Sequence, residues 1–322
     1  MKNKRILLVD ALNMFMRNYI VDPSLSINGH PIGGAKGFLK SLQAASRQIK
    51  PDLILIAWDG GSQKRKAINK NYKAGRGPVR LNRDIHNMTT SEQEENKIWQ
   101  QKRLIEYLNH MPVLQSYVDN VEADDIIALV SQSSVVGEYD KVILSSDKDF
   151  IQLCDDKTIL YRPIQKEILN QNRVVEKFGI HPTNFALARA IAGDKSDNLP
   201  GIGGVGLPTV SKRFPFLSEN KTYTIDDVVN HAAKMESKLK VYNSVVEKRE
   251  LIEENYKIMQ LYVPHISAQS AQRIRGMLKE LDLGFNKTAI QAMMITDGFG
   301  AYDWSDLFAL YNKTVVETKS RK

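Results

Sequence analysis

Cysteine is almost absent from this chain, since Cys154 is the only one among 322 residues. An internal disulfide and a cysteine-based zinc site are therefore excluded, and a reducing environment fits the composition. Long apolar runs are missing too. The longest, such as Ile6–Val9 and Leu53–Trp58, fall far short of the ~20 residues that a membrane helix needs. We therefore expect a cytoplasmic protein with neither a membrane span nor a secretory signal.

The composition is otherwise that of an ordinary globular protein. Hydrophobic residues make up 42% and charged residues 25% of the chain, which argues against wholesale disorder. A length of 322 residues is typical of about two domains, or of one large domain with an appendage. The formal net charge of +8 favours a polyanionic partner.

Three short apolar runs share one pattern, in which an aspartate closes each run. The runs are Arg5–Asp10, Leu53–Asp59 and Val142–Asp147, with helical stretches such as Gly37–Ile49 and Glu95–Leu108 between them. Near-continuous apolar strands are typical of a parallel sheet that helices cover on both faces. The sequence thus predicts an α/β fold with a mostly parallel central sheet flanked by helices. Ligands bind beyond the carboxyl ends of such strands, where the three aspartates would lie.

Further acids occur at a helix start and in two tight loops. The candidate metal ligands are Asp10, Asp59, Glu122, Asp124, Asp125, Asp147, Asp149, Asp194 and Asp197. Converging carboxylates repel one another unless cations neutralise them, and oxygen ligands select hard ions. We therefore expect two Mg²⁺ ions, for which Mn²⁺ can substitute, in a phosphodiester-hydrolysing site. Each acid alone could instead be a turn or helix-cap residue, but the whole set favours metal binding.

Residues 60–90 are rich in cations and poor in apolar residues. The cations are Lys64, Arg65, Lys66, Lys70, Lys73, Arg76, Arg80 and Arg83. One interpretation is a strip that tracks phosphates, with Tyr72 available for base stacking. A solvated loop is the alternative. Lys73 and Arg76 are the candidates for offsetting charge on a scissile phosphate.

A glycine-rich segment, Gly201–Gly206, separates helical stretches near Phe185–Ala192 and Thr209–Phe214. Its spacing matches the dinucleotide-binding fingerprint, but no strand precedes it, and Leu207–Pro208 excludes a P-loop. We interpret it as a hairpin whose backbone N–H groups hold a DNA phosphate. A plain helix cap and tight turn is the alternative. The DNA-binding candidates here are Gly201, Gly203, Gly206, Lys212 and Arg213.

Together these segments resemble the 5′-nuclease family that includes flap endonucleases, with the nearest likeness to bacteriophage enzymes called ribonuclease H or 5′-to-3′ exonuclease. The resemblance covers about residues 4–215. Its motifs, in family order, are Val9–Asp10, Trp58–Gly60, Tyr72–Arg76, Val121–Asp125, Ser146–Asp149 and Gly193–Gly203. The chain departs from the family at Leu207–Pro208, where many relatives have Glu-Lys, and at Trp58, where Phe is frequent.

The resemblance implies a PIN-like 5′-nuclease fold with an arch or bridge over the active site and a helix–three-turn–helix DNA clamp. We expect a catalytic domain over residues 1–190 with the arch at 60–100, a DNA-binding subdomain over 191–265, and a helical tail of unassigned role over 266–322. Matched residue by residue, the first metal cluster would be Asp10, Asp59, Glu122, Asp124 and Asp147. The second would be Asp125, Asp149, Asp194 and Asp197, with Asp124 shared in part. Lys73 and Arg76 would act on the scissile phosphate, and the hairpin glycines would bind the duplex backbone.

The function that the resemblance implies is that of a Mg²⁺-dependent 5′-to-3′ exonuclease and flap endonuclease acting on duplex DNA, RNA–DNA hybrids and 5′ flaps. In a phage it would remove RNA primers during DNA replication in the host cytoplasm, with a single-stranded DNA-binding protein or another replication protein as a partner. A catalytically silent, structure-specific DNA-binding protein of the same fold is an alternative, and it predicts missing metal ligands. A single-stranded ribonuclease of a related carboxylate fold is another, and it would not need the glycine hairpin.

Overall fold

The computed structural model describes residues 3–75, 88–235, 239–281 and 283–319. Within these ranges the chain forms a six-stranded sheet with the order β3-β2-β1-β4-β5-β6. The strands are β1 (Lys4–Asp10), β2 (Leu53–Trp58), β3 (Leu114–Tyr117), β4 (Tyr139–Leu144), β5 (Thr158–Arg162) and β6 (Glu167–Leu169). All neighbouring strands are parallel except β5 and β6. The predicted mostly parallel sheet is thus confirmed.

The strand register brings the predicted acids to one edge of the sheet. Val9, at the end of β1, pairs with Ile56 of β2 on one side and with Leu144 of β4 on the other. Because the three strands are parallel and end level with one another, the residues that follow them emerge at the same edge. Asp10 is the last residue of β1, and the chain reaches Asp59 directly after β2.

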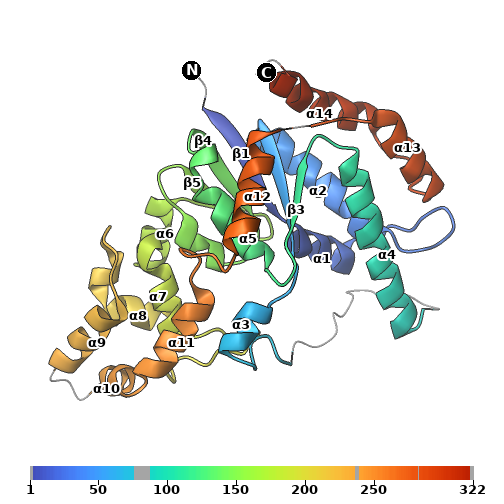
Figure 1. Ribbon diagram of the computed structural model, residues 1–322. Helices are drawn as coiled ribbons and strands as arrows, with labels where there is room; N and C mark the ends of the chain where they lie inside the picture. Colours follow the sequence, from blue (N-terminus) through green and yellow to red (C-terminus); the bar gives the residue numbers. More distant parts are fainter. Residues whose placement is uncertain (1–2, 76–87, 236–238, 282, 320–322) are drawn as a thin grey trace.

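Helices cover both faces of the sheet (Figure 1). Alternate residues of β1 point to opposite faces, so that Leu7 belongs to one apolar cluster and Leu8 to the other. The helices and 3-10 turns are α1 (Ala11–Val21), α2 (Gly33–Ile49), α3 (Gln63–Ile68), α4 (Thr90–Asn109), α5 (Ala123–Ser131), η1 (Ser134–Val136), η2 (Asp149–Leu153), α6 (Gln171–Phe178), α7 (Pro182–Ala192), η3 (Lys195–Asp197), α8 (Leu207–Arg213), η4 (Pro215–Ser218), α9 (Ile225–Lys234), α10 (Lys240–Glu247), α11 (Arg249–Met259), α12 (Ala268–Lys279), α13 (Lys287–Thr296) and α14 (Trp304–Lys319).

The middle of the chain builds a helical region beside the sheet. Helices α8, α9, α10 and α11 lie together at the lower left of Figure 1. Helix α11 packs against α7, which in turn packs against η2 at the edge of the sheet. The helices predicted near Phe185–Ala192 and Thr209–Phe214 correspond to α7 and α8, so the glycine-rich segment joins two helices, as predicted.

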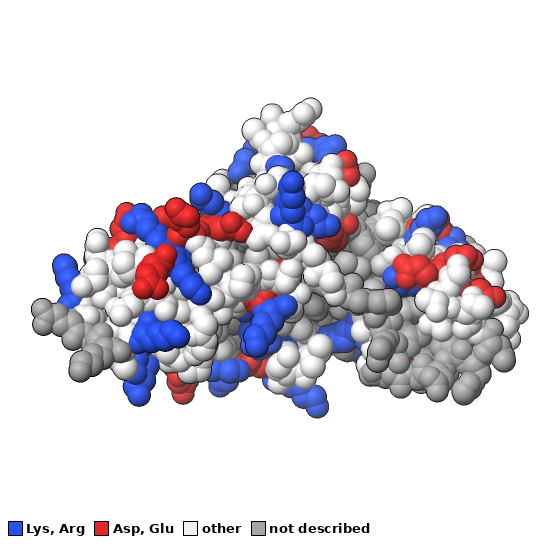
Figure 2. Space-filling model, turned by 90° about the horizontal axis from the view of Figure 1, so that it is seen from below, with Lys and Arg blue, Asp and Glu red and all other residues white. Residues whose placement is uncertain are grey.

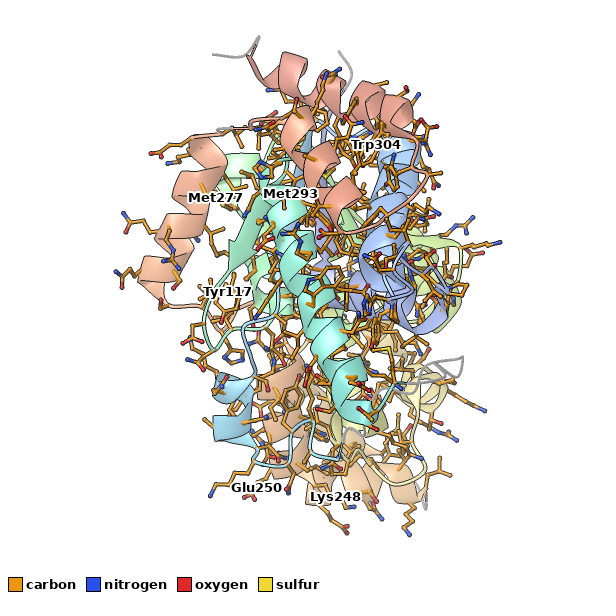
Figure 3. The ribbon with its side chains drawn as sticks, turned by 90° about the vertical axis from the view of Figure 1, so that its right-hand side faces the viewer. Tyr117, Lys248, Glu250, Met277, Met293 and Trp304 are labelled. Atoms are coloured by element: carbon orange, nitrogen blue, oxygen red, sulfur yellow. The ribbon has the colours of Figure 1, made fainter. Side chains whose placement is uncertain are left out.

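The C-terminal helices fold back over the N-terminal half. Helix α12 packs on α5, α13 on α4, and α14 on α2. Figure 3 shows α4 running between α12, which carries Met277, and the segment that carries Met293 and Trp304. Met294 and Tyr311 belong to the same apolar cluster as Leu7 of β1. The tail is therefore part of the core, while the division into three domains stays a prediction. No helix in the described ranges is long and apolar enough to span a membrane.

Candidate active site

Asp10 combines a structural role with the predicted functional one. Its carboxylate caps α1 by accepting a hydrogen bond from the N–H of Asn13 at 3.1 Å, and it accepts another from the hydroxyl of Ser145 at 2.9 Å. Burial raises the pKa of Asp10 to about 6, and the charges of Asp147 and Asp59 raise it further against these hydrogen bonds. The helix-cap interpretation therefore holds for this residue, while its role as a metal ligand stays a prediction.

Asp124 lies in the first turn of α5 and faces the same group of acids. Burial raises its pKa well above the usual range, and the charges of Asp147, Glu122 and Asp10 add to this more than Lys73 offsets it. Asp59 also has a raised pKa, chiefly through burial and then through Glu122. Acids that repel one another this way need a cation to remain ionised together.

Glu122 and Asp125 differ from the other acids because basic side chains already neutralise them. The Arg65 guanidinium lies 2.5 Å from Asp125 Oδ2 and 2.7 Å from Glu122 Oε2. Asp125 Oδ1 also accepts the N–H of His265 at 2.8 Å, and the Asp125 side chain is fully buried. We therefore correct the expectation for Asp125: its carboxylate is committed to Arg65 and His265 and does not contribute a free ligand to the second cluster.

Arg189 of α7 binds two acids of the second predicted set, Asp149 and Asp194. The guanidinium contacts Asp149 Oδ1 at 2.8 Å and also binds Asp194. Burial raises the pKa of Asp149 to about 7 although Arg189 opposes this, because Asp147 and Asp197 add like charge. For Asp194, burial raises the pKa, but hydrogen bonds from Ser196 and the charge of Arg189 outweigh it, and the net shift is downward. The structure thus brings these two acids together around a protein cation.

Lys73 connects the two acid sets. Its Nζ atom lies 2.5 Å from Oε1 of Glu122, and its pKa is raised because Glu122 and Asp124 outweigh burial. The side chain of Tyr72 is also buried, 4% exposed, and its hydroxyl donates to Glu122 Oε2 at 3.2 Å. The predicted base stacking by Tyr72 is therefore wrong, because neither face of the ring is free. The second predicted arch cation, Arg76, lies outside the described residues.

The cation strip predicted for residues 60–90 must be revised as well. Arg65 is only 3% exposed, so it belongs to the interior and not to a phosphate-tracking surface. Lys64 donates from its amine to the carbonyl oxygen of His265 at 2.7 Å. Seen from below, Lys and Arg side chains are spread over the molecule with acidic side chains between them (Figure 2).

The glycine hairpin packs tightly against the end of α7. A Cβ atom on Gly201 would lie 2.2 Å from the backbone of Ala192, so no other residue fits there. Gly203 is exposed with open space around it, and Gly206 caps α8. A groove of about 880 Å³ runs from these glycines to Lys148 and Arg189. Lys212 and Arg213 lie in the last turn of α8, at the opposite end of that helix from the hairpin.

The acids fit a divalent cation by their chemistry. Asp10, Asp124 and Asp147 supply only oxygen donors, and burial together with the charge of Asp147 destabilises the ionised forms of Asp10 and Asp124. Hard divalent cations are the ions that such donors select. Among the residues that the structure describes, no three His, Cys, Asp or Glu side chains are arranged closely enough to enclose one ion. Ion binding would therefore draw these carboxylates closer together.

Two arginines of the site were not recognised in the sequence as partners of the acids. Arg189 is the one charged residue of helix α7, and it stands within the apolar run Phe185–Ala192, which was the available signal. Arg65 was counted only as one of many cations, and nothing in its local spacing distinguishes it from Lys64 or Lys66. Its burial depends on α5 and α11, which are far away in the sequence.

Comparisons with known proteins identify the family of this chain. Residues 5–179 match the family model described as 5′-3′ exonuclease, N-terminal resolvase-like domain. The chain is 26% identical over 295 residues to a 5′-3′ exonuclease of Aquifex aeolicus. The aligned region covers 90% of this chain and 92% of the relative. The bacteriophage T5 5′-exonuclease solved with bound zinc has a TM-score of 0.68 at 18% identity, covering 86% of this chain and 99% of that one.

A bacteriophage T5 flap endonuclease solved with DNA and metal ions has a TM-score of 0.67 at 18% identity, with the same 86% and 99% coverage. At this identity the two T5 structures support the fold, whereas the family model spans more than half of the chain. The chain therefore belongs to the 5′-3′ exonuclease family of hydrolytic nucleases.

Proposed function

We propose that this nuclease is a Mg²⁺-dependent 5′-to-3′ exonuclease and flap endonuclease that hydrolyses duplex DNA and RNA–DNA hybrids at 5′ ends and flaps. The observation that carries the proposal is the repulsion among Asp10, Asp124 and Asp147 at the edge of the sheet, beside Lys73. A site with this charge pattern binds divalent cations and a phosphodiester more readily than a neutral small molecule.

Asp10, Asp59, Asp124 and Asp147 would hold the metal ions, which when bound supply a hydroxide nucleophile and stabilise the departing oxygen. Lys73 would contribute positive charge toward the scissile phosphate, since its amine lies beside Glu122 and its side chain is 19% exposed. Glu122 fixes that amine from the buried side. The protein therefore orients the phosphate through one rigidly held cation and the acidic edge of the sheet.

The DNA-binding part of the proposal depends on the hairpin. Gly203 and Leu207, each of which carries a backbone N–H, line the groove that ends at Lys148 and Arg189. Backbone donors of this kind bind phosphates without reading the bases, which suits a structure-specific enzyme. Substrates with a duplex and a 5′ strand are the class that fits both the hairpin and the acids. Removal of RNA primers during phage replication is the cellular role that we propose for it.

A labelled substrate panel tests the proposal. Single-stranded DNA, nicked duplex, 5′ flap and RNA–DNA hybrid would each be incubated with Mg²⁺ and then with chelator. We expect Mg²⁺-dependent products from the 5′ side of the flap and the hybrid, with single strands largely spared. Asp124→Asn should abolish cleavage and retain DNA binding in chelator. Tight binding of all duplexes without cleavage would instead support a catalytically silent DNA-binding protein.

A further inference from the structure

We propose that Arg65 is a positioning residue of the nuclease reaction, which holds Glu122 in place so that Glu122 in turn holds Lys73 at the border of the acids. The proposal deepens the proposed function and rests on it. The carboxylates that Arg65 contacts are those of Glu122 and Asp125, so the proposed effect on Lys73 passes through Glu122. Glu122 is the residue that contacts both Arg65 and Lys73.

Every donor group of Arg65 has a partner. Nε donates to the carbonyl oxygen of Ile258 at 2.9 Å, and the two terminal nitrogens bind Asp125 at 2.5 and 3.3 Å. One terminal nitrogen also lies 2.7 Å from Glu122 Oε2. With 3% of its surface exposed, the side chain has no room to move. A buried guanidinium bound on three sides is fixed in position and can therefore fix its partners.

The Glu122 carboxylate divides its two oxygens between two cations. Oε2 lies against Arg65 and accepts from the Tyr72 hydroxyl at 3.2 Å, whereas Oε1 lies 2.5 Å from Lys73 Nζ. The Glu122 side chain is 2% exposed, so water cannot replace a lost partner. Without the arginine, a buried carboxylate would have to be neutralised by Lys73 alone. Lys73 would then be drawn inward, away from a bound phosphate.

Arg65 also links the acids to the DNA-binding side. Its partner Ile258 belongs to α11, which packs against α3 (Figure 1). On the same helix, the buried Asn255 donates to the carbonyl oxygens of Ala190 and Pro200, at the base of the glycine hairpin. The guanidinium therefore joins α3 and α5 to the helix that supports the hairpin. A change at Arg65 should consequently alter the rate of cleavage more than DNA affinity.

The test compares Arg65→Lys with Arg103→Lys, a matched control in which a partly buried arginine of α4 pairs with Asp297 far from the acids. Lysine retains the charge but cannot bind two carboxylates as a planar fork. We expect Arg65→Lys to cleave a flap roughly 10²-fold more slowly under single-turnover conditions, with DNA affinity in chelator within about 3-fold. Arg103→Lys should cleave at the wild-type rate.

A second measurement reports on Lys73 without requiring activity. The metal-free protein is treated with an amine-reactive reagent, and modification of Lys73 is followed by mass spectrometry. We expect Lys73 to react several-fold more slowly in Arg65→Lys than in the wild type, because its amine is drawn inward to Glu122. The rate effect of Arg65→Lys should also largely vanish in a Lys73→Ala background, since residues that act through one another are not additive.

Additive rate effects, or unchanged reactivity of Lys73 in folded Arg65→Lys, would overturn the proposal. If Arg65→Lys does not fold, Glu122→Gln tests the same contact by removing the negative charge that holds Lys73. We expect Lys73 to be modified faster in that variant than in the wild type. An unchanged rate of Lys73 modification in Glu122→Gln would also overturn the proposal. A wild-type protein that cleaves nothing would refute the proposed function alone, because the labelling experiment would still test the arrangement of the three residues.

Discussion

The backbone N–H of Lys73 donates a hydrogen bond of 2.9 Å to the carbonyl oxygen of Asp197. The same residue is held through its side chain by Glu122, and its backbone adopts a left-handed conformation with φ of 57°. A non-glycine residue in this conformation is uncommon and needs surrounding contacts to maintain it. Lys73 is therefore fixed between the two acid sets from both its backbone and its side chain.

Replacing Lys73 should impair chemistry more than binding. We expect Lys73→Ala to slow single-turnover cleavage of a 5′ flap roughly 10²- to 10³-fold, while DNA affinity changes less than about 5-fold. Lys157→Ala serves as the control, because that exposed amine donates only to the carbonyl oxygen of Gly137. A loss of affinity with an unchanged rate would show that Lys73 tethers DNA and does not act on the phosphate.

The free energy of unfolding of the metal-free protein, measured in chelator, should fall as the pH rises. Burial raises the pKa of Asp10 to about 6 and that of Asp149 to about 7. The folded chain therefore binds more protons than the unfolded chain between about pH 4 and pH 7, and this stabilisation is lost as the pH rises through those folded values.

Melting temperatures of the metal-free protein at pH 5 and pH 8 measure this loss of stability. The difference between the two temperatures should be smaller in Asp10→Asn than in the wild type. Added Mg²⁺ should reverse the trend, because the ion binds the ionised carboxylates that form above about pH 6. A melting temperature that is independent of both pH and Mg²⁺ would contradict the coupled acid site.

The glycines of the hairpin should separate into structural and binding residues. Gly201→Ala would place a Cβ atom 2.2 Å from Ala192, so we expect it to destabilise the fold by about 3 kcal/mol or more. Gly203→Ala meets no atom within 4 Å and should leave the free energy of unfolding nearly unchanged. If its backbone approaches a phosphate, however, Gly203→Ala should weaken duplex binding. Urea unfolding and binding assays on both variants distinguish these effects.

Asp297 should be the main electrostatic anchor of the tail. Its carboxylate lies 2.7 Å from Arg103 Nε and accepts the hydroxyl of the buried Tyr107. Removing it leaves that hydroxyl without a partner, so we expect Asp297→Ala to destabilise the protein by about 2 kcal/mol in urea. Glu106→Ala removes only an exposed partner of Arg103 and should cost less than about 1 kcal/mol. If both variants lost the same free energy of unfolding, the buried contacts of Asp297 would contribute no more than the exposed ion pair of Glu106.

The sequence predicted the sheet and the acidic edge well because both depend on local patterns. Apolar runs that end in Asp10 and Asp59 identify buried parallel strands and their carboxyl ends together. The strands β3, β5 and β6 were not recognised, since Leu114–Tyr117, Thr158–Arg162 and Glu167–Leu169 are short and carry no closing aspartate. The hydrogen-bond partners of Asp125 and Tyr72 could not be predicted from neighbouring residues. Their partners, Arg65 and Glu122, lie about 50 or more residues away in the sequence.

The packing of α13 and α14 against α2 and α4 has a consequence for the newly made chain. The contacts of Phe299 with Lys36 and of Asp306 with Gln43 each close a loop of 263 residues. Long-range contacts of this kind form late, because a large loop must close before they can stabilise anything. During translation, the apolar cluster that contains Phe38 thus stays incomplete until Met294 and Tyr311 have been added to it. An apolar cluster that is completed so late is exposed to aggregation while it forms.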